Sequence, residues 1–413
     1  MLKKTKILII GNGFGGITAL KNLRKVFRGD KTIEFSLIGE KNYFLFTPLL
    51  HEVATGGINP MNIVEPIRKI FGHCLKNFYL GKAEKINFKD KTVQVNEIVV
   101  SYDYLVIAPG AETNFFGTPG AKENCFTLKS IEDAIKIKSH ATMQMEHASL
   151  VQDSIKRKEI LKFVVVGGGP TGVELVAEME ELVRETFSHY YRKEVVDDVS
   201  IVLVQRGGEL VPQFGAKIRK KSLQVLQEKG IEVMLDSAVK EVGASYVIIN
   251  DNTKIATDTV IWVGGIKPAS LDFTEPINLS PDGKLIVNEH LQLENHKEVF
   301  AIGDMALFKD KDSALPALAQ VAEKEAKMVA RNIKSLIDGT SLQSFSYHSS
   351  GNLMSLGQWM AVGEIGNFSF SGHLAWWFWR TVYLSKLISL RKKVRVAVDW
   401  TMNIFSPRDI SRL

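Results

Sequence analysis

Residues 163–179 read FVVVGGGPTGVELVAEM, and this motif gives the strongest indication of the fold class. A short run of aromatic and β-branched residues predicts a buried strand, and Gly167, Gly169 and Gly172 follow it. Apolar residues then recur at helical spacing. A strand, a G-x-G-x-x-G turn and a helix in this order are typical of dinucleotide binding, because the glycines let the backbone approach a pyrophosphate at the helix N-terminus.

The same arrangement occurs at the N-terminus. Residues 6–16, KILIIGNGFGG, are an apolar run that ends in Gly11, Gly13 and Gly16. The next strand candidate, IEFSLIG, is followed by Glu40, 24 residues beyond Gly16. An acidic residue at about this distance accepts hydrogen bonds from ribose hydroxyls. We therefore expect two dinucleotide sites and an α/β fold with two Rossmann-like domains.

The second site lacks the acidic residue. Its next strand, SIVLVQR at 200–206, ends in Gln205 and Arg206. A carboxylate at this position repels a 2′-phosphate, so its absence favours NADPH as well as NADH, and Arg206 would attract the phosphate. The sequence leaves open the alternative that Arg206 points into solvent.

A third motif, HKEVFAIGDMA at 296–306, predicts a strand that ends at Gly303 and Asp304. From a strand end, Asp304 can reach a ribityl or phosphate group. Two nucleotide sites in one chain are explained by electron transfer, in which a nicotinamide nucleotide delivers hydride to a tightly held flavin. The alternative is that one glycine turn is only structural.

Composition limits the other possibilities. The chain has 413 residues, 45% hydrophobic and 24% charged, as in an ordinary globular protein. Its two cysteines, Cys74 and Cys125, are far apart, which excludes a disulfide scaffold and a C-x-x-C redox pair. The nine histidines form no metal-binding pattern, so we expect no metal.

The C-terminal tail carries the charge. Residues 372–413 contain eight Lys or Arg and two Asp, which accounts for the whole net charge of +6, and four of the six tryptophans. The stretch GHLAWWFWRTVYLSKLISL at 372–390 is apolar, but Arg380 and Lys386 within it disfavour a membrane span. We expect helices that lie on a surface of anionic lipid, or a tail packed on its own domain or on a dimer partner. We expect no nucleic-acid binding.

The second helix predicted in the tail is the clearer one. A polar stripe recurs at spacings of three and four, and apolar residues occupy the rest of the helix. The stripe is Lys392, Arg395, Asp399 and Asn403, and the apolar set is Val394, Val398, Trp400, Met402 and Phe405.

Several motifs together resemble the two-dinucleotide-domain flavoproteins and, more closely, the type II NADH dehydrogenases. The first group is the two glycine turns, YDYLVIAPGAETNFFG at 102–117 and VFAIGDMA. The closer resemblance rests on NYFLFTPLLHEVATGGINP at 42–60, LPALAQVAEKEA at 315–326 and WTMNIFSPRDI near the C-terminus. It implies a single-subunit NAD(P)H:quinone oxidoreductase that does not pump protons.

The resemblance implies roles for particular residues. FAD would be held by Gly11, Gly13, Gly16 and Glu40, with Asp304 near its ribityl–phosphate part and the loop around Pro48 against the flavin. The nicotinamide nucleotide would lie over Gly167, Gly169 and Gly172, with Gln205 at the ribose position and Gly264 bordering the site. Glu174 would lie near both rings and would orient the nicotinamide or take part in proton exchange. The alternative is a Glu in the first turn of a helix that is stabilised by the helix dipole. Ala319 and Gln320 would shape the quinone mouth.

One departure from the family pattern concerns the quinone contact. The family's A-Q-x-A-x-Q element has a second Gln, and Lys324 stands there in this chain. Lys324 would pair with a Glu or face solvent instead of contacting quinone.

The expected organisation is a FAD-binding domain of residues 1–115 and 266–335. A NAD(P)H-binding domain of residues 116–265 is inserted into it, and a membrane-association region covers 336–413. We expect a homodimer bound peripherally to the cytoplasmic face of the inner (plasma) membrane. Two other hypotheses stay open: a reductase with a protein acceptor such as ferredoxin, and a non-enzymatic flavin-binding protein that responds to NADH.

Overall fold

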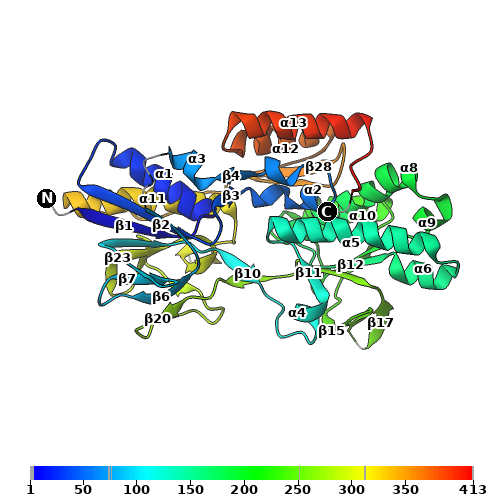
Figure 1. The fold of residues 1–413 in the computed structure, drawn as a ribbon, viewed down its shortest axis with the longest axis horizontal. Helices are drawn as coiled ribbons and strands as arrows, with labels where there is room; N and C mark the ends of the chain where they lie inside the picture. Colours follow the sequence, from blue (N-terminus) through cyan, green and yellow to red (C-terminus); the bar gives the residue numbers. More distant parts are fainter. Residues whose placement is uncertain (1–3, 73–74, 76, 251, 311–312, 412–413) are drawn as a thin grey trace. The chain divides into compact units, whose positions relative to one another are not determined.

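The computed structural model describes residues 4–72, 75, 77–250, 252–310 and 313–411. The chain forms two compact units (Figure 1). Unit 1 consists of Met1–Phe44, Glu65–Glu112 and Ile266–His348, and unit 2 of Leu45–Val64, Thr113–Gly265 and Ser349–Leu413. Cys74 lies outside the described residues.

The main sheet of unit 1 is six-stranded, in the order β22-β23-β9-β1-β2-β5. All neighbours are parallel except β22, which runs antiparallel at the edge. Residues Ile7–Ile10 are buried on both faces, as expected for a central parallel strand. The bounds are β1 Thr5–Ile10, β2 Ile33–Gly39, β5 Asn77–Leu80, β9 Tyr104–Ile107, β22 Gln292–Leu293 and β23 His296–Ala301.

The two faces of this sheet are covered by different elements. Helices α1 (Phe14–Val26) and α11 (Ala319–Asp338) lie side by side on one face (Figure 1). On the other face, Leu8 and Ile10 pack in one core cluster with Ile86 and Val93 of a smaller sheet, ordered β20-β6-β7-β8. That sheet is formed by β6 Ala83–Asn87, β7 Thr92–Val95, β8 Ile98–Ser101 and β20 Asp272–Phe273.

Unit 2 repeats this design. Its parallel five-stranded sheet has the order β11-β18-β12-β13-β14. One face packs on the antiparallel sheet β15-β16-β17, and helices α5, α7 and α10 contact the strands of the sheet. The strands are β11 Cys125–Thr127, β12 Lys162–Val166, β13 Ser200–Val204, β14 Glu232–Met234, β15 Val239–Gly243, β16 Tyr246–Ile249, β17 Thr253–Ala256 and β18 Thr259–Trp262, and the helices α5 Ile131–Leu150, α7 Pro170–Glu181 and α10 Ala216–Glu228. The prediction of two Rossmann-like α/β domains is confirmed.

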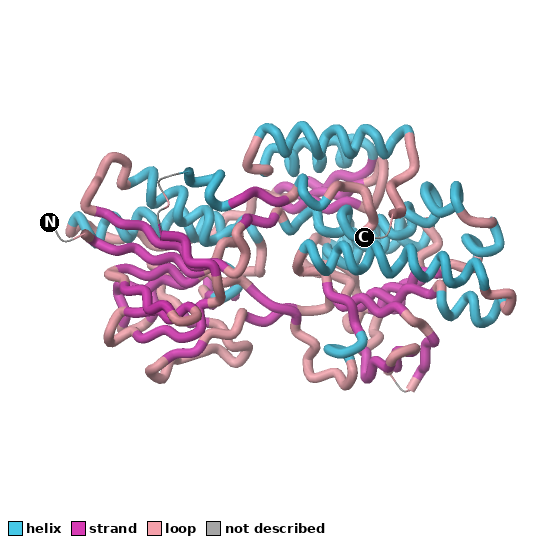
Figure 2. The backbone as a smooth tube through the Cα atoms, in the orientation of Figure 1, coloured by secondary structure: helices cyan, strands magenta, loops and turns pink. Residues whose placement is uncertain are grey.

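The C-terminal region belongs to unit 2 and contains strands that the sequence analysis did not predict. An antiparallel sheet, β27 (Asn352–Ser355), β28 (Ala361–Ile365) and β29 (Phe368–Gly372), precedes the two tail helices. Helix α12 (His373–Lys386) packs on β28 and β29, and α13 (Leu390–Phe405) follows α12 (Figure 2). In the described part of the chain, every helix is too short or too polar to cross a bilayer.

Helix α13 turns most of its polar stripe inward: Lys392, Asp399 and Asn403 contact the segment 57–62, whereas Arg395 is exposed. Asp399 accepts hydrogen bonds from the side chain of Asn62 at 2.7 Å and from the backbone N–H of Asn59 at 3.1 Å, and the Asn403 amide donates to the carbonyl of Gly57 at 2.6 Å. Trp400 differs from the sequence-based expectation, because it is buried and not on the outer apolar face. The exposed apolar residues of α13 recur every three or four residues and form an outer apolar stripe, beside which Arg391 and Arg395 are also exposed: Leu390, Val394, Val398, Met402 and Phe405.

The remaining segments connect these layers. Those that follow the strands of unit 1, or link the units, are β3 Tyr43–Leu45, β4 Val64–Pro66, α3 Ile67–Phe71, β10 Ala111–Thr113, β19 Ile266–Pro268, β21 Leu285–Ile286, η5 Gly303–Met305, β24 Ala306–Leu307, β25 Lys309–Asp310 and β26 Ser313–Ala314. Those of unit 2 are η1 Thr47–Leu49, α2 Leu50–Ala54, η2 Pro60–Asn62, α4 Ala121–Asn124, α6 Ser154–Ile160, the π-helical turn η4 Leu182–Phe187, α8 Ser188–Tyr190 and α9 Lys193–Asp197.

Candidate active site

The first glycine turn joins β1 to α1 in unit 1. A Cβ atom on Gly16 would lie 1.8 Å from the carbonyl oxygen of Gly11, so only glycine allows the helix to pack this closely. A Cβ on Gly13 would meet nothing within 4 Å. Gly13 is the N-cap of α1, and no side chain caps the helix there. This geometry fits a pyrophosphate group.

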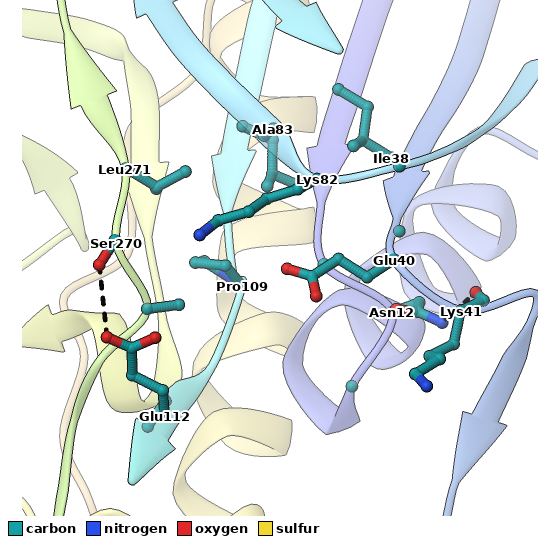
Figure 3. Close-up of a pocket in the computed structure, with 17 residues that line it drawn as sticks. Asn12, Ile38, Glu40, Lys41, Lys82, Ala83, Pro109, Glu112, Ser270 and Leu271 are labelled. Carbon is teal, nitrogen blue, oxygen red and sulfur yellow. Dashed lines mark hydrogen bonds between the residues drawn. The ribbon is translucent and has the colours of Figure 1, made fainter. Parts of the chain in front are cut away.

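Beside this turn lies a cavity of about 290 Å³, which Figure 3 shows in close-up. Glu40 enters it from the end of β2, and its carboxylate points toward the same space as the ammonium group of Lys82. Across the cavity, the Ser270 hydroxyl donates a hydrogen bond to Glu112 at 3.3 Å. The sequence analysis named Glu40 but none of the other three, which come from separate segments.

Asp304 follows β23 in unit 1, directly after Gly303, whose φ of +68° favours glycine. The turn lies beside the first glycine turn, because a Cβ on Gly15 would be 3.3 Å from Ile302. Buried Glu325 of α11 accepts a hydrogen bond from the Gly303 N–H at 2.6 Å. Burial raises the pKa of Glu325 to about 7, against the effect of that N–H.

Ala319 and Gln320 begin α11 and are half-buried. Lys324, one turn further, donates to the backbone carbonyl of His348 and lies over the ring of Tyr347, 5.1 Å from its centroid. Its ammonium group thus contacts a backbone carbonyl and an aromatic ring, and the residue is half-buried. Gln320 and Lys324 both belong to unit 1, with Gly11, Glu40 and Asp304.

The second glycine turn, between β12 and α7 in unit 2, has the same geometry. A Cβ on Gly172 would lie 1.9 Å from the carbonyl oxygen of Gly167, whereas Gly169 has nothing within 4 Å. Gly167 itself has φ of +118° and packs against Gly264, whose Cα would lie 2.4 Å from an added Cβ. The structure thus brings Gly264 to the turn, and leaves open space above Gly169 for a second pyrophosphate group.

Gln205 contacts this turn directly. Its side-chain oxygen accepts a hydrogen bond from the Gly168 N–H at 2.9 Å, and its amide nitrogen donates to the carbonyl of Glu209 at 3.3 Å. Arg206 lies over the ring of Phe116 with its Cζ 5.5 Å from the centroid. Gln205 therefore supports the turn, while Arg206 is exposed and lies over an aromatic ring.

Pro48 lies in Leu45–Val64, the first of the three segments that form unit 2, within the 3₁₀ turn η1. Phe46, two residues before Pro48, is buried and meets Tyr383 of α12 edge-on, with centroids 6.2 Å apart. Pro48 is therefore placed by contacts to the C-terminal region, and the structure puts it in the same unit as Glu174.

Glu174 is buried in the first half of α7. It accepts a hydrogen bond from the Ser355 N–H at 3.1 Å, and its other oxygen lies 3.7 Å from Nδ1 of His51. Burial raises the pKa of Glu174 well above its ordinary value, and the charges of Glu52 and Glu178 add to this effect. Burial lowers the pKa of His51 to about 4. A neutral Glu beside a neutral His can hold and release a proton.

His51 was missed by the sequence analysis, as were several charged residues buried around Glu174. The signal that could have found them is in α7, where four glutamates interrupt an apolar helix and three of them are buried. Burial raises the pKa of the Cys125 thiol to about 12, whereas a reactive cysteine requires a lowered pKa. The buried cluster, named here the α7 cluster, is His51, Glu52, Glu174, Glu178, Glu181, Lys229, Arg380 and Arg408.

The two units, each with a parallel sheet and an open glycine turn, define an oxidoreductase with two dinucleotide-binding domains. A sequence model of the pyridine nucleotide-disulphide oxidoreductase family matches residues 5–326, and one of the NDH2 C-terminal domain matches 349–409. The chain belongs to this family and, within it, to the type II NADH dehydrogenases.

Individual relatives agree. The chain is 31% identical to a probable NADH dehydrogenase of Dictyostelium discoideum, over 100% of this chain and 92% of that protein. It is 30% identical to the type II NADH:quinone oxidoreductase Ndh of Mycobacterium tuberculosis, over 98% and 89%. Its fold matches NDH2 of Plasmodium falciparum with a TM-score of 0.91 at 23% identity, over 99% of this chain and 100% of that one.

Proposed function

We propose that the protein catalyses the oxidation of NADH by a membrane quinone, without pumping protons. FAD, when bound, accepts the hydride of NADH and passes two electrons on. The observation that carries this proposal is the pair of equivalent turns, each with open space above its middle glycine, Gly13 in unit 1 and Gly169 in unit 2. A flavoprotein that is reduced by one nucleotide needs two such sites.

The test uses the purified full-length protein with FAD. Without oxygen, NADH should bleach the yellow flavin absorbance, and a short-chain quinone should restore it. An iron–sulfur protein in place of the quinone tests the alternative of a protein acceptor. A sample that takes up no FAD, or a flavin that NADH does not bleach, contradicts the proposal.

In unit 1, we assign FAD binding to Gly11, Gly13, Gly16, Glu40 and Asp304. The cavity beside Glu40 supports the assignment, since a carboxylate there can accept hydrogen bonds from ribose hydroxyls. Ala319 and Gln320 are assigned to the quinone mouth on the resemblance alone. Their test is the KM for quinone in a Gln320→Ala variant, with the FAD content as the control.

In unit 2, we assign NADH binding to Gly167, Gly169, Gly172 and Gly264, with Gln205 supporting the turn. Pro48 is assigned to the flavin-facing loop. We assign to Glu174 the role of holding the proton that quinone reduction consumes, because it is buried beside His51 and its pKa is raised. A Glu174→Gln variant that keeps every rate constant contradicts this role.

We also propose that NADPH is accepted beside NADH. Gln205 is uncharged and contacts the turn, so no carboxylate at this position repels a 2′-phosphate, and Arg206 lies next to it. The test compares kcat/KM for the two nucleotides. A value with NADPH that is a thousandfold below the value with NADH, a difference of about 4 kcal/mol, contradicts the proposal.

Peripheral membrane binding is proposed for the outer apolar stripe of α13. Exposed apolar side chains of α12, Leu374, Trp377 and Phe378, support it. A continuous apolar surface with basic residues around it is suited to a lipid interface. A homodimer and the cytoplasmic face of the membrane are proposed on the resemblance. Sedimentation of the purified protein, and NADH access in vesicles of known orientation, test these two.

A further inference from the structure

The last described residues of the chain reach into the interior of unit 2. After α13 the chain turns back, and Arg408 lies buried against α7. Its guanidinium donates to Oε2 of Glu178 at 2.8 Å and to the hydroxyl of Thr55 at 2.9 Å. The Arg408 backbone N–H donates to the hydroxyl of Thr186 at 3.2 Å, in the π-helical turn that follows α7. Three hydrogen-bonding groups on three segments thus fix the side chain and the backbone N–H of Arg408.

Arg408 meets a row of carboxyl groups on one face of α7. Glu174, Glu178 and Glu181 are spaced by four and three residues, so they share a face of the helix. Glu181 also accepts a hydrogen bond from Lys229 at 3.1 Å and lies 3.4 Å from Arg408. Glu174 accepts the hydrogen bond from the backbone N–H of Ser355. The groups that face this row from other elements are His51 and Glu52 of α2, Lys229 after α10, and Arg380 and Tyr383 of α12.

Among these carboxyl groups, only Glu178 has its pKa shifted downward. Burial by itself would raise it, but the charge and hydrogen bond of Arg408, with His51 and Arg380, outweigh burial. Burial, together with the charge of Glu178, raises the pKa of Glu52 to about 8 and that of Glu181 to about 7. Like charges this close cannot all ionise, so one charged member keeps protons on the others.

We propose that Arg408 is a positioning residue for quinone reduction: it fixes the negative charge of the α7 cluster on Glu178, and this charge adds to the effect of burial in keeping the proton on Glu174. Arg408 touches Glu178 and not Glu174 in the hydrogen bonds that place it, so it acts through its partner. The inference rests on the proposed function, since it concerns the proton that this reaction consumes.

The reaction balance shows why a held proton matters. NADH, a quinone and one proton give NAD⁺ and a quinol. Two electrons and one proton leave NADH as hydride, and the second proton of the quinol must come from a protein group or from water. Glu174 supplies this proton and regains it from solvent. A cluster that lost its charge on Glu178 would hold that proton less tightly.

The test compares Arg408→Met, Arg408→Lys, Glu178→Gln and the double variant Arg408→Met/Glu178→Gln in the FAD-loaded, full-length protein. At saturating NADH, the pH profile of kcat/KM for quinone is measured. Arg408→Met and Glu178→Gln should both move the alkaline limb to lower pH, by about one unit. The double variant should move it no further than either single variant. Arg408→Lys, which keeps the charge, should leave the limb in place.

A second measurement does not depend on turnover. In the resting protein at pH 7, Arg408→Met should gain infrared carbonyl intensity from a newly protonated carboxylic acid, and the double variant should lack this gain. If Arg408→Met does not fold, Glu178→Gln and Arg408→Lys decide the question by their pH profiles.

Loss of turnover in Arg408→Met with an unmoved alkaline limb and no infrared gain would overturn the inference and leave Arg408 a structural residue. So would a limb that stays in place in Glu178→Gln. Failure of the proposed function has another signature: the wild-type protein would not reduce quinone at all, whereas the infrared comparison would still report on the Arg408–Glu178 pair.

Discussion

The indole Nε1 of Trp400 donates a hydrogen bond to Oε2 of Glu52 at 2.6 Å, across 348 positions of sequence. Both side chains are buried, and the bond joins α13 to α2. Trp400 also stacks near Arg380, whose Cζ lies 4.7 Å from its ring. Helix α13 is therefore bound to the segment 45–64, which contains α2, by a buried hydrogen bond and not only by apolar packing.

Protonation of Glu52 should make the free energy of unfolding depend on pH. Burial raises the pKa of Glu52 to about 8 from an unfolded value of about 4.5. Between these values the unfolded chain releases a proton that the folded protein keeps, so rising pH destabilises the fold through this group, by at most about 1.4 kcal/mol per pH unit.

The measurement is the free energy of unfolding against pH for the wild type and Glu52→Gln. The wild type should lose stability relative to the variant from about pH 5 to 8 and then run parallel to it. The control is Glu232→Gln, at an exposed position of β14, which should give a curve parallel to the wild type throughout. A constant difference for Glu52→Gln would contradict the prediction.

Substitution of Gly13 and of Gly16, which lie in the same turn, should have different effects. Gly13→Ala places a methyl group in open space with an ordinary backbone conformation, so the protein should fold but retain FAD at least about tenfold more weakly. Gly16→Ala puts the methyl group against the Gly11 carbonyl and should destabilise unit 1 by about 1–3 kcal/mol or more. Flavin content per chain and thermal unfolding distinguish the two, and equal melting temperatures would show that the packing argument is wrong.

A carboxylate at position 205 should restrict the nucleotide. In Gln205→Glu the acceptor for the Gly168 N–H is kept, while a negative charge is added near the ribose. The efficiency kcat/KM with NADPH should fall at least about tenfold, or 1.4 kcal/mol, and that with NADH should change far less. Arg206→Ala is the companion variant and should lower only the NADPH efficiency. Equal losses with both nucleotides would indicate damage to the turn instead.

The outer stripe of α13 should govern membrane binding. Val398 is 52% exposed, so Val398→Asp should leave the fold intact but weaken co-sedimentation with anionic vesicles several-fold, because the new charge would have to enter the lipid interface. The matched control is Ile155→Asp on α6, where the side chain is 71% exposed and belongs to no such stripe. Vesicle binding that is unaffected by Val398→Asp would exclude this surface as the lipid contact.

Local patterns made the glycine turns, the buried strands and Glu40 predictable. Each lies within about 30 residues of sequence, in which spacing and chain geometry determine one another. The α7 cluster was not predictable in this way. Arg408, Glu52 and Glu178 meet only when α2, α7 and the tail pack together, and nothing in their own neighbourhoods in sequence specifies the partners.

The C-terminal sheet was missed for a different reason. Its second hairpin turns at Gly366 and Asn367, a pair that favours tight turns between strands, and Gly366 has φ of +56°. The aromatic residues that follow were attributed to the lipid-facing tail. From the sequence, Gln205 was noted only because it replaces the expected acidic residue. In the structure, its side-chain oxygen accepts a hydrogen bond from the Gly168 N–H in the turn.

The inward polar stripe of α13 has a practical consequence for obtaining a soluble form of the enzyme. Cutting the chain before the tail would strip Glu52, Asn62 and Gly57 of their hydrogen-bonding partners and would remove the cation that faces Glu178. Such a shortened protein would fail for reasons unrelated to lipid. Detergent-free preparations are better sought by replacing the five outward apolar side chains while every inward one is retained.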